Sequence, residues 1–375
     1  MKAGWQSEPF EGCITKVRYT PKIPRQDFLG DGAFPIVSQE AEFINGYWNN
    51  EVDLFRVSTP VIVFGDHTKV LKYIDFDFVL GADGVKILQP RDFLLPKFFY
   101  YQLQTAPLDS LGYARHYRLL KELHIVYPAK LEQQRIVTIL DEAFAGIATA
   151  RAAAEQNRQN ARALFDSHLQ SVFSQRREGW IDTTIGAVIK FIDYRGKTPV
   201  KTESGVRLIT AKNVKMGYLQ ETPAEFIAAE GYASWMTRGI PKKGDVLFTT
   251  EAPLANVAQL DTDEQVAFAQ RIIIMQPDSE SLDSAFLKYL LLSQTVQQRI
   301  RKKGTGATVQ GIKASLLKLI EISFPESLAS QEQIVRELDA LQEETRRLES
   351  IYRRKLKALD QLKQSLLHQA FSGQL

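Results

Sequence analysis

The chain has very little cysteine. Cys13 is the only one in 375 residues, so an internal disulfide framework is excluded and a reducing cytoplasm is favoured. The five histidines are scattered, and none stands near cysteine or another histidine at the spacing of metal ligands. Hydrophobic runs of membrane-spanning length are missing too, and the first residues lack the apolar core of a signal peptide. We therefore expect a soluble cytoplasmic protein without a metal site.

The motifs of several enzyme classes are also missing. An adenine methyltransferase would need an Asn/Asp-Pro-Pro-Tyr/Phe loop, and the chain has no Pro-Pro pair. A common type of metal-dependent nuclease would need Glu-x-Lys, and no glutamate is followed by lysine two residues later. Gly196-Lys197-Thr198 lacks the first glycine of a phosphate-binding loop, because position 191 is phenylalanine. We predict that this chain is not an enzyme.

Neither sign of charge is in large excess. Lys and Arg number 47 against 44 Asp and Glu, which gives +3 at pH 7 and a pI near 8.7. This weakly favours an acidic partner, and a nucleic-acid-binding surface would have to come from local basic clusters. The hydrophobic fraction of 44% is ordinary for a globular protein. A chain of this length usually exceeds one hydrophobic core, so two or more domains are expected.

What the chain does contain is a long internal repeat. The segment Ile136-Val137-x-x-Leu140-Asp141 recurs at positions 334–339 as Ile-Val-x-x-Leu-Asp. The same offset of 198 residues relates further pairs: Leu164 and Leu362, Ser167 and Ser365, Leu169 and Leu367, Phe173-Ser174 and Phe371-Ser372. Looser matches precede each copy, such as Gly4-Trp5 with Gly179-Trp180. A variable region followed by a conserved region occurs twice in the chain. This duplication predicts a molecule that performs the same function on two different targets.

Inside each copy the apolar residues recur at steps of three and four, which predicts a helix with a heptad seam. About 44 helical residues would form a rod of roughly 65 Å, longer than a small domain is wide. If the two helices run antiparallel with flush ends, small Ala154 faces large Tyr352, and we predict that they form a coiled coil. Two separate amphipathic helices, each packed on its own domain, are the alternative. The predicted seam residues are Leu140, Ile147, Ala154 and Leu164 in the first helix and Leu338, Leu348, Tyr352 and Leu362 in the second.

The variable regions have the pattern of mixed domains. Short apolar runs bounded by Gly and Pro predict strands at 34–38, 60–64, 85–88, 206–210, 245–249 and 270–275, and helices are expected at 94–104 and 283–303. The fold class is therefore α+β: two mixed α/β domains separated by two long antiparallel coiled-coil helices, as a pseudo-twofold repeat. We place the first domain at 1–130, the first helix at 131–176, the second domain at 177–328 and the second helix at 329–375.

Basic and amide-bearing loops are the candidate contact surfaces. Arg, Lys, Gln and Asn side chains can contact base edges, and Lys, Ser and Thr can hold phosphates. The clusters at 113–118 and 301–310 stand at equivalent points of the repeat, after a helix and before the last strand. Ordinary solvated loops are the alternative at each position. The candidate DNA-binding residues are Gln39, His67, Lys69, Arg115, His116 and Arg118 in the first domain, and Arg195, Lys197, Lys212, Asn213, Lys302, Lys303, Thr305, Thr308, Gln310 and Lys313 in the second.

These features together resemble the specificity (S) subunit of type I restriction–modification enzymes. The resemblance is carried by the duplicated Gln-Arg-Ile-Val-x-x-Leu-Asp (134–141) and Gln-Ile-Val-x-x-Leu-Asp (333–339), and by the helix ends Leu-x-x-Ser-x-Leu-x-x-x-Phe-Ser (164–174 and 362–372). The phrase Asp-Tyr-Arg-Gly-Lys-Thr-Pro (193–199), and the Gly306-x-x-x-x-Gly-Ile-Lys313 segment with its closing Phe-Pro, also look like that family's recognition domains. The first domain lacks the Arg-Gly-Lys-Thr-Pro phrase.

The resemblance implies that each recognition domain reads one half of a split target in double-stranded DNA and that the helices set the gap. It implies two methyltransferase subunits, which use S-adenosylmethionine to methylate adenine at N6, and, in the restriction form of the complex, two motor–nuclease subunits that use ATP and Mg. This chain itself is expected to hold no cofactor. Two alternatives stay open: a recognition component whose single partner carries both methylation and cleavage, and a coiled-coil scaffold that binds proteins.

Overall fold

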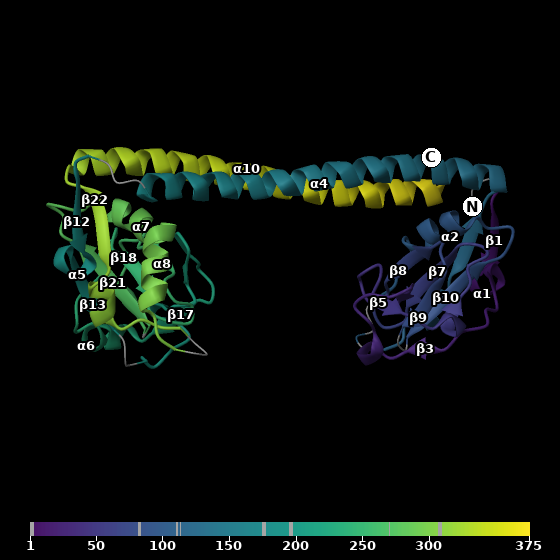
Figure 1. Cartoon of the computed structure of the whole chain (residues 1–375), viewed down its shortest axis with the longest axis horizontal. Helices are drawn as coiled ribbons and strands as arrows, with labels where there is room; N and C mark the ends of the chain where they lie inside the picture. Colours follow the sequence, from purple (N-terminus) through teal and green to yellow (C-terminus); the bar gives the residue numbers. More distant parts are fainter. Residues whose placement is uncertain are drawn as a thin grey trace. The chain divides into compact units, whose positions relative to one another are not determined.

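The computed structural model describes residues 4–81, 84–109, 112, 114–174, 178–194, 198–269, 271–306 and 310–375. The chain forms two compact units, one of Met1–Gln156 with Tyr352–Leu375 and one of Asn157–Ile351. Each unit holds a mixed α/β domain and part of both long helices, α4 (Lys130–Ser174) and α10 (Leu328–Ser372) (Figure 1). The prediction of an α+β fold with two long helices is confirmed.

The domain of the first unit combines antiparallel strand pairs with parallel pairing of β9 to β3 and β4. Strand β1 pairs with β11, and a four-stranded sheet runs in the order β2-β10-β7-β8. A further sheet runs β3-β9-β4-β5, with β6 on β9. The bounds are β1 (Gln6–Pro9), α1 (Phe10–Cys13), β2 (Ile14–Thr15), β3 (Lys22–Ile23), η1 (Arg25–Asp27), β4 (Phe34–Val37), β5 (Gly46–Trp48), η2 (Glu51–Asp53), β6 (Leu54–Phe55), β7 (Val61–Gly65), β8 (Leu71–Ile74), β9 (Phe78–Gly81), β10 (Val85–Pro90), α2 (Pro96–Leu103), α3 (Tyr117–Lys121) and β11 (His124–Tyr127).

The domain of the second unit repeats this plan. Strand β12 pairs with β22, and a four-stranded sheet runs β13-β21-β18-β19, while β17-β14-β20 and β15-β16 form smaller sheets. The bounds are β12 (Trp180–Thr184), α5 (Ile185–Val188), β13 (Ile189–Asp193), β14 (Val206–Ile209), β15 (Val214–Lys215), β16 (Tyr218–Leu219), β17 (Glu225–Ile227), η3 (Ala229–Gly231), α6 (Tyr232–Trp235), β18 (Val246–Thr249), β19 (Val257–Gln259), β20 (Val266–Phe268), β21 (Ile272–Pro277), α7 (Ser284–Leu292), α8 (Gln294–Lys303), α9 (Ala314–Lys318) and β22 (Glu321–Pro325).

One predicted helix is interrupted. The sequence predicts a single helix over 283–303, but the structure has α7 and α8 with Ser293 between them. Ser293 has an extended backbone, with φ −60° and ψ 141°. Its hydroxyl donates to the carbonyl of Leu290 (2.6 Å) and accepts from the N–H of Val296. A buried serine that caps α8 therefore competes with helix continuation.

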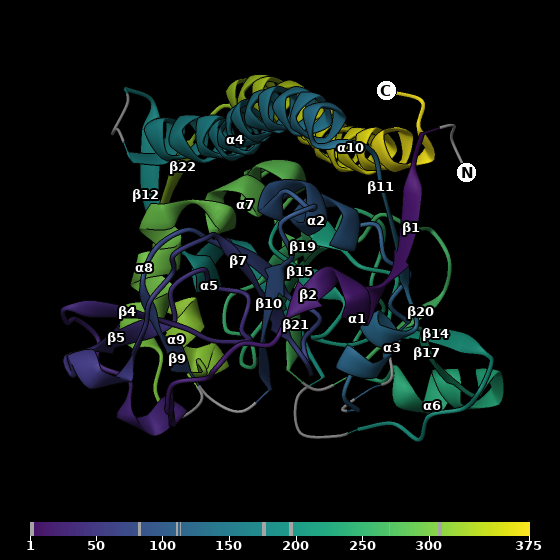
Figure 2. The same ribbon diagram turned by 90° about the vertical axis from the view of Figure 1, so that its right-hand side faces the viewer.

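The two long helices lie side by side and antiparallel within each unit (Figures 1 and 2). In the first unit Arg151 of α4 pairs with Asp360 of α10, and Leu140 shares a core with Leu367. In the second unit Arg162 pairs with Glu349 at 2.9 Å. Ala154 and Ala161 are buried, as is Thr345, while Ile147, Leu348 and Tyr352 are half-buried.

The seam departs from the predicted heptads near the end of each helix. Leu164 and Leu362 were expected in the seam, but their exposed fractions are 54% and 47%. The neighbouring Phe165 and Lys363 are half-buried, so the contact stripe has moved by one residue. A straight helix has 3.6 residues per turn, and a 3.5-residue pattern drifts by about 20° per heptad relative to it. Over four heptads the drift approaches the 100° that separates adjacent residues.

Each domain is fastened to the start of one long helix and the end of the other. In the first unit Phe98 of α2 packs on Phe371 of α10, with ring centroids 5.2 Å apart. In the second unit Phe286 of α7 packs in the same way on Phe173 of α4, at 5.4 Å. The hydroxyl of Tyr101 donates to Asp141, and that of Tyr289 donates to Asp339. Burial and these hydrogen bonds raise the pKa of both tyrosines, which keeps the phenols protonated as donors.

A buried glutamine completes each attachment. Gln133 accepts from the N–H of Leu95 (2.8 Å) and donates to the carbonyls of Phe93 (2.8 Å) and Pro128 (2.9 Å). Gln331 repeats these three bonds with Asp283, Ser281 and Pro325 at 2.8, 2.9 and 2.7 Å. The conserved part of the repeat thus includes the polar contacts that fix each domain to its helix.

Gln331→Ala is expected to lower the free energy of unfolding by about 2–4 kcal/mol, because it leaves buried backbone groups without partners. Chemical denaturation of the wild-type and variant chains measures the change. Gln333→Ala is the matched control, since Gln333 is exposed on the same helix and its amide donates to the neighbouring carboxylate of Glu337 (3.1 Å). Equal stability of the two variants would contradict the anchoring role of Gln331.

Candidate nucleic-acid interface

Three loops meet in the first unit on the side of the domain that faces away from the long helices (Figure 1). The turn after β7 begins at Asp66, whose N–H donates to the carbonyl of Gly84 just before β10 (2.7 Å). The carbonyl of Asp66 accepts from the N–H of His116, just before α3 (2.8 Å). The carboxylate of Asp66 accepts from the N–H of Tyr117 (2.7 Å). Asp66 therefore ties the three loops together.

The second unit uses the same backbone network. The N–H of Thr250, after β18, donates to the carbonyl of Arg271 just before β21 (2.8 Å). The carbonyl of Thr250 accepts from the N–H of Ile312, shortly before α9 (2.9 Å). Thr305 and Gly311 exchange backbone bonds of 2.8 and 2.9 Å, which close the loop after α8. Both units thus present loops of different sequence on one common framework.

Gln39, His67 and Lys69 all lie in this loop cluster of the first unit. The side-chain oxygen of Gln39 accepts from the N–H of His67 at 3.4 Å. A Cβ atom at Gly84 would lie 2.6 Å from that oxygen and 2.9 Å from the His67 ring, so a larger residue would displace the two side chains, and the φ of +92° also favours glycine. The Lys69 ammonium donates to the carbonyl of Leu108 (3.3 Å). Arg115 and Arg118 are exposed nearby in sequence.

His116 has a structural position that the sequence did not reveal. Its exposed fraction is 1%, and its Nδ1 lies 3.0 Å from the carbonyl oxygen of Asp66. The prediction that His116 contacts DNA is therefore corrected, because the side chain is enclosed by the loops it holds together. A histidine whose neighbours in sequence are arginines gives no pattern that separates these two roles.

A buried lysine shapes the loop that carries Gln39. The ammonium of Lys72, on β8, donates to the carbonyls of Glu42 and Phe43 and to the side-chain oxygen of Asn45 (2.9 Å). Asn45 also accepts from the N–H of Ser38 at 2.8 Å. Residues 38–45 are thus wrapped around one cation. Burial lowers the pKa of Lys72 to about 8, although Glu40 and Glu42 act in the opposite direction.

Binding of target DNA by the first unit is expected to weaken between pH 7 and pH 9, with a midpoint near the Lys72 pKa of about 8. Below this pH the ammonium offers three donors to its three acceptors, and above it the neutral amine offers only two. Because the folded-state pKa lies below the ordinary value, the proton is lost from the folded protein first. The measurement is target binding at several pH values with each half-site varied separately. Lys72→Met should remove the pH step, and a step confined to the second half-site would contradict the assignment.

The candidate residues of the second unit divide into three groups. Lys212, Lys302, Lys303, Thr305, Gln310 and Lys313 are exposed. Lys302 and Lys303 end α8, and Lys313 precedes α9, so the loop between these helices has basic side chains at both of its ends. Arg195, Lys197 and Thr308 lie outside the described residues.

Asn213 is the third group, and it is buried with an exposed fraction of 1%. Its oxygen accepts from the N–H and hydroxyl of Thr210, and its amide donates to the carbonyls of Gln220 and Pro223 at 3.0 Å. All four bonds of the amide are therefore used inside the loop. The prediction that Asn213 contacts DNA is corrected, because its side chain closes a turn.

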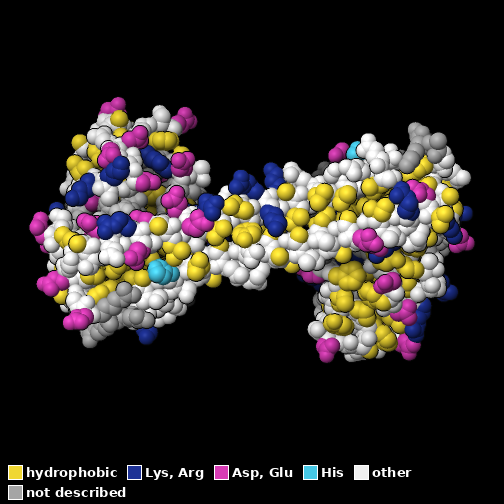
Figure 3. Space-filling view, turned by 90° about the horizontal axis from the view of Figure 1, so that it is seen from above, with side chains coloured by type: hydrophobic (Ala, Val, Ile, Leu, Met, Phe, Trp, Pro, Cys, Tyr) yellow, Lys and Arg dark blue, Asp and Glu magenta, His cyan; other side chains and the backbone are white. Residues whose placement is uncertain are grey.

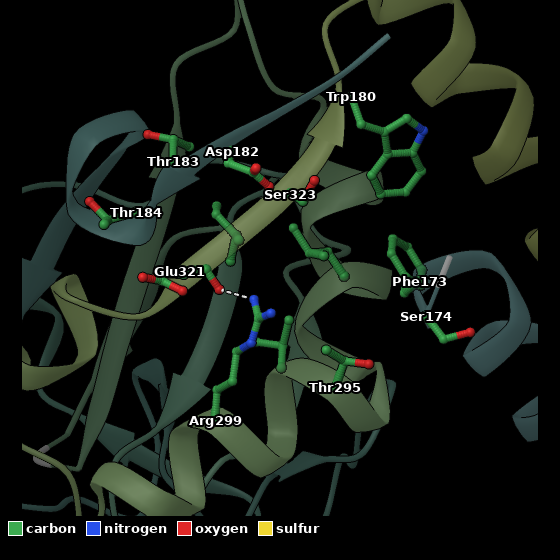
Figure 4. Close-up of a pocket in the computed structure, with 13 residues that line it drawn as sticks. Phe173, Ser174, Trp180, Asp182, Thr183, Thr184, Thr295, Arg299, Glu321 and Ser323 are labelled. Carbon is green, nitrogen blue, oxygen red and sulfur yellow. Dashed lines mark hydrogen bonds between the residues drawn. The ribbon is translucent and has the colours of Figure 1, made fainter. Parts of the chain in front are cut away.

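A separate cleft of about 560 Å³ lies in the second unit, beside the attachment to the long helix (Figure 4). Phe173 and Trp180 line one part of it, and Asp182 and Ser323 project from the paired strands β12 and β22. Arg299 of α8 donates to the carbonyl of Glu321 (2.7 Å). The lining includes no histidine or cysteine. A smaller cleft of about 320 Å³ occupies the corresponding place in the first unit, beside Phe371 and Ser372.

Two further observations bear on the kind of protein this is. Within the described ranges, no three His, Cys, Asp or Glu side chains are grouped so that they could hold a metal ion. Across the same residues, no helix combines the length and apolar composition needed to cross a membrane.

Comparison with known proteins identifies the family. Residues 178–357 match the family model for the type I restriction modification DNA specificity domain. Over 350 residues the chain is 25% identical to the specificity subunit of the Escherichia coli type I restriction enzyme EcoR124I/EcoR124II, which covers 88% of this chain and 84% of that protein. Residues 178–357 thus match the specificity-domain family of type I restriction–modification systems, and the chain as a whole is similar to a specificity subunit. The resemblance noted from the duplicated helices is thereby confirmed.

Solved structures share the fold of this chain. A chain from a study of complex assembly and conformational transition of the type I R-M system has a TM-score of 0.76 and 18% identity, and covers 100% of this chain and 99% of that one. The HsdS subunit from Thermoanaerobacter tengcongensis has a TM-score of 0.56 and 18% identity, with 100% and 98% covered. The family role is DNA recognition within a restriction–modification complex, and a specificity subunit is not itself catalytic.

Proposed function

We propose that each mixed domain of this specificity subunit reads one half of a bipartite target in double-stranded DNA. The observation that carries the proposal is the common loop framework of the two units. Asp66 and Thr250 make the same backbone contacts, while the side chains mounted around them differ. A shared scaffold with different polar side chains suits two related domains that bind different base sequences.

Partner subunits supply the chemistry in this proposal. Two methyltransferase subunits would use S-adenosylmethionine to methylate adenine at N6 in the cytoplasm. In the restriction form of the complex, two motor–nuclease subunits would use ATP and Mg. The long helices offer a surface for such partners, because apolar side chains gather along them between lysines and arginines (Figure 3). Leu131 at the start of α4 is 87% exposed, and Leu164 and Leu362 add to the exposed apolar area. Exposed apolar patches of this kind suit protein partners.

The experiment distinguishes phosphate contacts from base contacts in the loop after α8. Lys302→Ala should weaken binding to all sequences alike and reduce the salt slope by about one unit, because one phosphate contact is lost. Gln310→Ala should cost roughly 1–3 kcal/mol on the proper target and relax one base of the second half-site. Binding of the complex with its methyltransferase partner is measured on a library randomised in both half-sites.

Lys243→Ala is the matched control for this experiment. Lys243 lies in the same domain and pairs with Asp263 at 3.0 Å, outside the loop cluster. It should leave both the salt slope and the base preference unchanged. If Gln310→Ala changed the base preference in the first half-site but not in the second, the assignment of one half-site to each unit would be contradicted. If no sequence preference existed at all, a protein-binding scaffold would be the better description.

A further inference from the structure

The turn before β21 has an arginine where the corresponding turn of the first unit has a glycine. Gly84 and Arg271 occupy equivalent places, since each carbonyl accepts the N–H of the residue that ties the loops together. The two residues have φ values of +92° and +78°. Residues with a Cβ atom rarely adopt this left-handed backbone, and glycine adopts it without strain. The second unit therefore places a long cationic side chain where its backbone favours glycine.

The side chain of Arg271 is oriented by one neighbour. Its Nε lies 2.9 Å from a carboxylate oxygen of Glu251, and the two side chains are 46% and 44% exposed. Glu251 is itself held by a β-bridge to Gly311, in the loop after α8. The two terminal nitrogens of Arg271 make no hydrogen bond with any residue that the structure describes. Because Nε is engaged with Glu251, the far edge of the guanidinium remains available as a pair of parallel donors.

The pair of Arg271 and Glu251 adjoins the basic loop after α8. Gly311 belongs to the segment that carries Lys302, Lys303 and Gln310, so the pair is attached to the basic loop by backbone contacts. At the equivalent point of the first unit, Gln39 and His67 lie against Gly84. Each unit thus has one polar pair over the same turn: Gln39 with His67 in the first, and Arg271 with Glu251 in the second.

We propose that Arg271 is a specificity-determining residue of the second unit, which reads a guanine through its two terminal nitrogens, and that Glu251 is its positioning residue. This inference rests on the proposed function of the two domains. Guanine presents two acceptors, N7 and O6, on one edge in the major groove, and their spacing suits a pair of arginine donors. A backbone strained to place a particular side chain is typical of functional sites.

The test uses the complex of the full chain with its methyltransferase partner and a DNA library randomised in the second half-site. Arg271→Gly should reduce preference for one guanine roughly 10- to 100-fold. The variant should melt at the same temperature as the wild type or higher, because glycine fits the φ of +78°. Arg271→Lys should not restore the preference, since an ammonium cannot make the paired contact. Glu251→Ala should weaken preference at the same base by a smaller factor, and Lys243→Ala should change nothing.

Three results would overturn the inference. A uniform loss of binding for all sequences, rescued by Arg271→Lys, would make Arg271 a phosphate contact. A lower melting temperature with unchanged base preference would make it a structural residue. An unchanged preference in a stable Arg271→Gly variant would place it outside the interface. In all three cases the wild-type complex still prefers particular bases in the second half-site. Failure of the proposed function is different, because the wild type itself would then show no such preference.

Discussion

Ala154→Asp is expected to lower the free energy of unfolding by several kcal/mol, on the order of 3–5, because it places an unpaired charge in the seam between α4 and α10. Ala154 is 1% exposed, and the ion pair of Arg151 with Asp360 shows the two helices in contact one turn away. Small residues allow the helix axes to approach, so even a neutral larger side chain would be resisted at this position.

The matched control is Ala153→Asp, which adds the same carboxylate at an exposed position of the same helix. Denaturant unfolding of both variants gives the comparison, and the control should stay within about 0.5 kcal/mol of the wild type. Equal destabilisation by the two substitutions would show that general charge effects, and not burial in the seam, determine the result. Equal and negligible effects would show that the helices do not pack at Ala154.

A seven-residue insertion near Ala154, together with one near Tyr352, is expected to lengthen the gap between the two recognised half-sites. Each long helix continues without interruption from one unit into the other, at 156–157 in α4 and 351–352 in α10. Seven residues add about 10 Å of helix, roughly three base pairs of DNA. DNA also rotates over that distance, so the domains would have to meet a different groove face and total activity should fall.

A single insertion in α4 alone is the control for the double insertion, because it shifts one helix against the other and breaks the seam. The readout is the spacing preference of the methylation complex on targets whose gap varies by single base pairs. A double-insertion variant that stays folded and keeps the original spacing would contradict the view that helix length determines the gap.

The duplicated helices were predictable because their signal is long and repetitive. Steps of three and four over four heptads specify a helix, and an offset shared by many residues specifies a second copy. The later part of the seam was not predictable at the level of single residues. Whether Leu164 or Phe165 faces the partner depends on how tightly the helices supercoil, which the spacing of apolar residues does not determine.

The loops were harder because polar side chains serve two purposes. His116 and Asn213 were expected at the surface, but both are buried and bond to backbone groups. Composition cannot tell an amide that binds a base from one that closes its own turn. The sequence does not single out Arg271 for the converse reason, since it stands at the start of an apolar strand. Only its alignment with Gly84, seen through the shared backbone contacts, distinguishes it.

The most direct measurement is DNA sequencing that maps the methylated adenines. The DNA is methylated by the complex of this chain with its methyltransferase partner, for the wild type and for Gln39→Ala. The account predicts one bipartite motif, with two specified halves and an unspecified gap of fixed length. It further predicts that Gln39→Ala relaxes bases in one half only, because Gln39 lies in the loop cluster of the first unit. A continuous motif, or relaxation of both halves by this single substitution, would contradict the division of recognition between the two units.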